Sequence, residues 1–190
     1  MDSIERQIKI NGVKSGVILG IIVTALSIAS FYFITATPSP AMFVAGPIIF
    51  AIFLPIFCVT FLCFKARKDV GGYWTFKQAT TGIFTMFLVA FVLQFIGKDI
   101  IFDKFVEPGN ALKVQTAAVN AKAAILKQRG NTPQVIDKDI AELKKDFTQP
   151  APTVGSTIQG IIISIIFIFI LALVFGALFK RDPPGTVSNL

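Results

Sequence analysis

The sequence has no histidine, and it has two cysteines and one tryptophan in 190 residues. Histidine is the commonest metal ligand and the most frequent general acid or base, so its absence argues against a metal site and against an enzyme. Cys58 and Cys63 stand on nearly opposite sides of one helix, so they cannot form a disulfide with each other. We expect two buried thiols that act as small hydrophobes, with no metal and no cofactor.

Charged residues are also few. They make up 15% of the chain, whereas soluble domains carry ~25%. Residues 15–64 have none at all, and a helix that crosses the hydrocarbon core needs ~20 apolar residues, so this run can hold two such helices. The composition predicts an all-α integral membrane protein whose first partner is the lipid bilayer.

The apolar runs predict four transmembrane helices within a single membrane domain over residues 1–190, at residues 13–35, 41–64, 76–102 and 154–179. Pro38 and Pro40 mark the turn between the first two. A basic head before an apolar run also resembles a signal peptide. The apolar run at residues 16–34 is, however, longer than the usual ~7–15 residues, so we expect it to be retained as the first span.

Between the third and fourth spans, residues 104–152 have the composition of a water-exposed segment. A first helical pattern stops near Gly130, which suits a C-terminal cap. A second pattern starts at Thr132 and Pro133, which suit the N-cap and the first helical position. We predict an antiparallel, extracytoplasmic helical hairpin.

Small residues recur at four-residue steps on the first and fourth spans: Gly12, Gly16 and Gly20, and then Ser156, Gly160 and Ser164. This step places them on one helix face, where the backbone of another helix can approach closely. The first face fits either a dimer interface or packing against the chain's own helices, and we favour the chain's own helices.

Two prolines, Pro47 and Pro55, interrupt the second span, and Gln94 lies within the third. Proline removes a backbone hydrogen bond and kinks a helix, which a bilayer tolerates when neighbouring helices compensate. Broken helices also line transporter sites, but the second span has few polar side chains, so we interpret the prolines as structural kinks. We interpret Gln94 as a residue that hydrogen-bonds a neighbouring helix rather than as part of a transport path.

The hinge at residues 65–82 separates the second and third spans and carries four basic residues and the only tryptophan. Tyr73 and Trp74 are predicted to anchor it at the membrane interface. Because the positive-inside rule weighs short loops, we predict that the hinge and both termini are cytoplasmic. The net charge of +7 lies beside the apolar runs, which suits anionic headgroups rather than nucleic acid.

The sequence resembles a bacterial family known as domain of unknown function 4199, typical of Bacteroidota. The resemblance rests on the glycine-spaced first helix, the hinge motif at residues 71–79 followed by Gly82, the restart at Thr132 and Pro133, and the final apolar helix. It implies a small four-helix protein of the bacterial inner membrane and carries over no catalytic residue. It also implies an accessory role associated with envelope glycosyltransfer.

These observations predict a non-catalytic accessory or scaffold subunit of an inner-membrane complex, which binds other membrane subunits or further copies of itself. The alternative is a small transporter or lipid-handling protein that uses the kinked second helix and Gln94. Asp99 and Asp103 share a face of an α-helix and could hold a cation, but a solvated helix end is the simpler interpretation.

Overall fold

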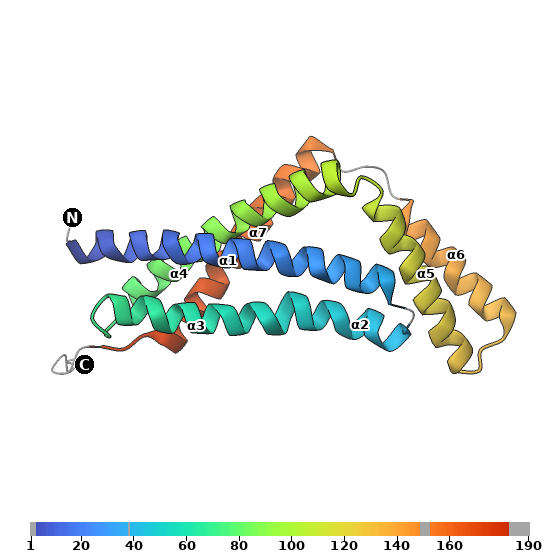
Figure 1. Cartoon of the computed structure of the whole chain (residues 1–190), viewed down its shortest axis with the longest axis horizontal. Coiled ribbons are helices and arrows are strands. Elements are labelled where there is room, and N and C mark those ends of the chain that lie inside the picture. The colour runs from blue at the N-terminus through green and yellow to red at the C-terminus, as the bar shows by residue number, and fades with distance from the viewer. Residues whose placement is uncertain (1–2, 38, 149–152, 183–190) are drawn as a thin grey trace. The chain divides into compact units, whose positions relative to one another are not determined.

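The computed structural model describes residues 3–37, 39–148 and 153–182. Helices make up most of these ranges, and Figure 1 shows them in chain order. They are α1 (Ser3–Ala36), α2 (Pro40–Ile48), the π-helical segment η1 (Ile49–Phe53), α3 (Leu54–Asp69), α4 (Phe76–Gln94), the π-helical segment η2 (Phe95–Val106), α5 (Asn110–Gln128), α6 (Pro133–Phe147) and α7 (Val154–Phe179). No β-strand occurs in the described ranges, where a single β-bridge joins Trp74 to Arg181.

Four helical stretches of the described chain are long and apolar enough to cross a membrane: Ile4–Ala36, Pro40–Asp69, Phe76–Val106 and Val154–Phe179. The all-α class with four candidate spans therefore agrees with the sequence prediction. The first helix differs at its start, because α1 begins at Ser3 and includes the polar head. Ile8 explains the difference, since its side chain is 2% exposed and belongs to the core.

The fold divides into two compact units. Unit 1 comprises Met1–Val23, Pro55–Phe95 and Thr153–Leu190, and unit 2 comprises Thr24–Leu54 and Ile96–Pro152. The core of unit 1 draws on all four of its helical segments and on the hinge: Ile8, Leu19, Val59, Leu62, Cys63, Ala66, Trp74, Ala79, Ile83, Met86, Ala90, Ala172 and Phe179.

In unit 1, α7 lies beside α4 (Figure 1). Edge-to-face ring pairs join the two helices, Phe84 with Phe169 and Phe87 with Phe175, each with ring centroids 5.7 Å apart. Gly176 lies against Thr80, and Phe169 lies against Phe84, so the partner number falls along α7 as the residue number rises from Thr80 to Phe84 and the two helices run antiparallel.

In unit 2, α5 and α6 form an antiparallel hairpin (Figure 1). Gly130 ends α5 with a φ of 75°, a conformation that costs glycine little. The following Asn131 N–H donates to the carbonyl of Leu126 at 3.2 Å, which closes the helix end. Thr132 occupies the N-cap position of α6 without a side-chain cap bond. The predicted hairpin insert at residues 104–152 includes residues 149–152, which lie outside the described residues.

Candidate functional site

The glycine face of α1 lies against α4 of the same chain. A Cβ on Gly12 would come 2.8 Å from the Gly82 carbonyl oxygen, and one on Gly16 would come 2.7 Å from the Met86 carbonyl oxygen. A Cβ on Gly20 would come 2.8 Å from the Cβ of Leu93. The partner numbers rise together, so α1 and α4 run parallel, with their backbones in close contact along three successive turns.

The small residues of α7 are divided between a packed face and an open face. Ala172 is fully buried, and Gly176 packs on Thr80 of α4. Ser156 and Gly160 are exposed and Ser164 is half-buried. A Cβ on Gly160 would meet no other atom of the described chain within 4 Å. The face that carries Gly160 therefore has no neighbour within this part of the chain.

Both prolines of the second span flank the π-helical segment η1. Pro47 lies inside α2, and Pro55 follows Leu54, whose N–H donates to the carbonyl of Ile49 five residues earlier. The proline ring clashes with the carbonyl four residues before it, and widening the helix to π geometry relieves this clash. Gln94 is half-buried at the end of α4, where the second π-helical segment begins.

The hinge closes α3 and opens α4 through defined backbone geometry. Gly71 and Gly72 have φ angles of 96° and 85°, and the Gly72 N–H donates to the Arg67 carbonyl at 3.0 Å. A capping box starts α4: the Thr75 N–H donates to Oε1 of Gln78 at 3.0 Å, and the Gln78 N–H donates to the Thr75 hydroxyl. The pattern of threonine and glutamine three residues apart is a readable signal that our sequence interpretation missed.

The two aromatic residues of the hinge have different environments. Tyr73 is 40% exposed, with the guanidinium of Arg181 5.8 Å from its ring centroid. Trp74 is 2% exposed, so its ring packs inside unit 1 rather than at a lipid interface. Its backbone exchanges two hydrogen bonds of 2.8 Å with Arg181, which fixes the chain after α7 to the hinge. The anchoring role stays a prediction for Tyr73.

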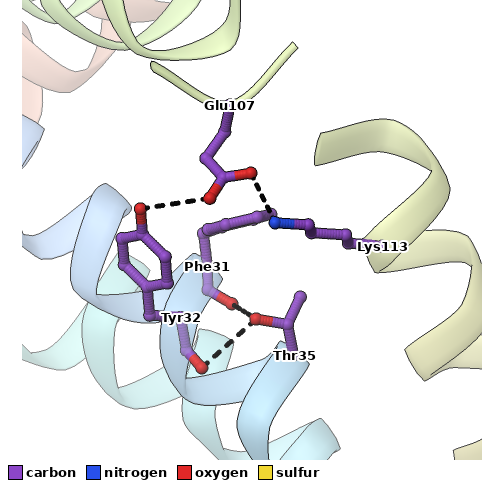
Figure 2. Close-up of polar contacts among 5 residues, drawn as sticks. All are labelled: Phe31, Tyr32, Thr35, Glu107 and Lys113. Atoms are coloured by element: carbon purple, nitrogen blue, oxygen red, sulfur yellow. Dashed lines mark hydrogen bonds and ion pairs between the residues drawn. The ribbon is translucent and has the colours of Figure 1, made fainter. Parts of the chain in front are cut away.

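Unit 2 contains a polar and aromatic cluster around the C-terminal end of α1 (Figure 2). Glu107 accepts a 3.4 Å hydrogen bond from the Tyr32 hydroxyl and forms a 2.6 Å ion pair with Lys113. The buried ring of Phe102 packs edge-on against Phe31 and Tyr32, with ring centroids 5.3 and 5.8 Å away. The cluster ties α1 to the chain that enters α5.

A cavity of about 390 Å³ lies in unit 2. Its wall is mostly apolar and includes Phe31 and Phe147, and its polar side chains are those of Ser27, Ser30, Lys98 and Asn110. Lys98 Nζ lies 2.7 Å from the carboxylate of Asp103, so its charge is locally balanced. A cavity of this size and lining is within the range that binds small amphiphilic molecules.

Within the described ranges, no three His, Cys, Asp or Glu side chains are grouped so that they could hold a metal ion. Four apolar spans with close backbone packing between them define a multi-pass α-helical membrane protein. Residues 14–181 match the family described as Protein of unknown function (DUF4199), and the chain belongs to this family, which confirms the resemblance at the hinge. No curated protein and no solved structure matches the chain.

Proposed function

We propose that this protein is a non-catalytic accessory or scaffold subunit of a complex in the bacterial inner membrane. Both termini and the hinge face the cytoplasm, and the α5–α6 hairpin faces outward. The basic residues at the hinge and beside both ends support this orientation through the positive-inside rule.

The observation that carries the proposal is the open half of α7. Its buried residues are Ala172, Gly176 and Phe179, all in the second half, whereas α4 has five buried residues along its length. The first half of α7 is largely apolar and mostly exposed, and a Cβ on Gly160 would meet no other atom of the described chain within 4 Å.

Eight other glycines lie in the candidate spans, and most of them, unlike Gly160, are in close contact with another part of the chain. The exception is Gly155 in the first turn of α7. At seven of the eight an added Cβ would lie less than 3.0 Å from another atom: Gly12, Gly16, Gly20, Gly46, Gly82, Gly97 and Gly176. In membranes, small residues allow the backbones of two helices to approach closely, whereas lipid chains pack against bulky and small residues alike. We therefore assign the Gly160 face to a transmembrane helix of a partner subunit.

Gentle purification from native membranes tests this assignment. The proposal predicts a membrane protein that elutes with the chain in a fixed ratio and is lost from the Gly160→Leu variant. The Ile162→Leu variant is the matched control, because residue 162 lies on the opposite side of α7. Isolation of the wild-type chain as a lone homo-oligomer with bound lipid would contradict the accessory role.

The cavity of unit 2 favours a second candidate function, the handling of lipid. Its polar side chains converge on an apolar space, and the Lys98–Asp103 pair leaves it without an unbalanced charge. These features suit a zwitterionic or hydroxyl-bearing lipid rather than a free anion. If the protein is instead a small transporter, the same cavity would be its substrate site.

Retention of phosphatidylethanolamine from mixed micelles, measured by mass spectrometry, tests the lipid-handling candidate. The Ser30→Leu variant fills the cavity and should lose the retained lipid, whereas Thr157→Leu on the exposed part of α7 should keep it. Equal retention by both variants would rule this candidate out. The association with envelope glycosyltransfer stays a prediction from the family resemblance, and the identity of a co-purified partner would test it.

A further inference from the structure

A second concave site lies in unit 1, between the first turns of α1 and the first turns of α4. It is a groove of about 170 Å³ whose lining side chains are Glu5, Ile8, Lys9, Lys77, Gln78 and Thr81. We call it the Lys9–Lys77 groove. Ile8 is 2% exposed and forms an apolar floor, whereas Lys9 and Lys77 are exposed at the rim.

Neither lysine of the groove forms an ion pair with a described residue. Among the described residues, ion pairs occur at Lys98–Asp103 and Lys113–Glu107 and not at Lys9 or Lys77. Glu5, the one acidic side chain of the groove, is likewise without an ion pair in these ranges. The groove therefore carries two cations against one anion, with the cations held on neighbouring helices.

Two further donors face the same groove. Gln78 uses its side-chain oxygen to accept the Thr75 N–H, which leaves its amide N–H₂ as a donor. The Thr81 hydroxyl lines the groove as well. Two ammonium groups, an amide and a hydroxyl together match the several acceptor oxygens of a phosphate.

The position of the groove along the helices indicates whether its ligand is a dissolved anion or a lipid headgroup. After Lys14 the first span has no charged residue, and after Lys77 the third span has none before Lys98. The groove thus lies where both parallel helices pass from charged to apolar sequence, which is the depth of lipid headgroups. Basic pockets between transmembrane helices at this depth bind anionic headgroups.

We propose that the Lys9–Lys77 groove binds the phosphate headgroup of an anionic membrane lipid. The two lysines and the Gln78 amide contact the phosphate oxygens. Glu5 opposes binding and limits the affinity. The assignment is independent of the partner-subunit and cavity proposals.

The test compares the full-length protein in mixed micelles of phosphatidylcholine and phosphatidylglycerol, with the retained lipid counted by native mass spectrometry. Wild-type protein should retain phosphatidylglycerol in preference to phosphatidylcholine. The double variant Lys9→Gln/Lys77→Gln should lose this preference by about tenfold or more, since each lysine near a charged surface contributes roughly a factor of five. Glu5→Gln should instead increase retention, a gain that misfolding cannot produce.

The double variant Lys65→Gln/Lys68→Gln is the matched control, because it removes the same charge from the end of α3, outside the groove. It should retain phosphatidylglycerol as the wild type does. Equal loss in both double variants would overturn the proposal, since it would show diffuse attraction to the whole basic surface. Displacement of the lipid by inorganic phosphate at equal concentration would also overturn it, because the groove would then be a site for a dissolved anion.

Discussion

Gly82 lies directly against the indole ring of Trp74: a Cβ on Gly82 would come 2.7 Å from Cζ2 of the tryptophan. Trp74 is 2% exposed, and the cavity beside its ring is about 10 Å³, the space of a single water. The indole ring has no space into which it could move away from an added methyl group. Glycine at position 82 is therefore what allows Trp74 to lie inside unit 1.

The Gly82→Ala variant should lose about 1–3 kcal/mol of unfolding free energy, because the added methyl group overpacks a filled core. Chemical denaturation in micelles, followed by Trp74 fluorescence, measures this loss. Gly160→Ala is the control, since nothing lies within 4 Å of its Cβ position. It should be neutral or stabilising by up to about 1 kcal/mol. Equal effects at both positions would refute the packing described for Gly82.

The capping box at the start of α4 predicts a second effect. Thr75→Ala removes the side chain that caps the Gln78 N–H, and it should cost about 1 kcal/mol. Thr75→Ser keeps the hydroxyl and should restore most of the loss. Thr157→Ala is the control on α7, where the hydroxyl bonds only a carbonyl of its own helix. A Thr75→Ser variant as unstable as Thr75→Ala would show that the methyl group, not the cap, is what matters.

In unit 2, we expect the packing of Phe102 on Phe31 and Tyr32 to contribute more stability than the Glu107–Lys113 ion pair. Phe102 is 3% exposed and packs on two rings, so Phe102→Ala should cost about 3 kcal/mol or more. The Glu107–Lys113 pair is partly exposed, and Glu107→Gln should cost less than about 1 kcal/mol. Thermal unfolding of both variants in the same detergent gives the comparison. A larger loss of stability from Glu107→Gln than from Phe102→Ala would contradict this expectation.

The orientation predicts which residues an impermeant maleimide reaches from outside the cell. In a Cys58→Ala/Cys63→Ala background, Asn120→Cys on the hairpin should be labelled in intact spheroplasts. Lys68→Cys in the hinge should be labelled only after lysis. Both positions are exposed, so access through the membrane decides the result. Labelling of Asn120→Cys from the cytoplasmic side would invert the proposed topology.

The spanning helices were predictable because each apolar run is long and uninterrupted by charge, and hydropathy alone identifies such runs. The residues at which the helices begin and end were harder to predict. The start of α1 at Ser3 depends on Ile8 being buried by residues far along the chain. The π-helical segment η2 also changes the register: Lys98 pairs with Asp103, five residues on, whereas α-helical spacing had grouped Asp99 with Asp103.

Packing partners were harder to predict than helices. Four-residue glycine spacing indicates that a helix comes close, but it does not say which helix, and the structure assigns α4 to the first face. The preference of tryptophan for the membrane interface predicted Trp74 as an anchor of the hinge and gave no sign that its ring is buried in unit 1. Its burial depends on Gly82, which lies two helical turns along α4, and no pattern in the hinge alone reveals that pairing.

Photocrosslinking from a position beside Gly160 in intact membranes tests the central claim, that the open face of α7 binds a partner subunit. Gly160 itself is kept, because a bulky residue there would displace the partner. A photoreactive amino acid instead replaces Thr157, which lies about 60° around the helix from Gly160, in one variant and Ile162, on the opposite side from Gly160, in another. We predict a single protein adduct of fixed mass from position 157 and only lipid adducts from position 162. Lipid adducts alone from both positions, or an adduct of this chain with itself, would contradict this claim.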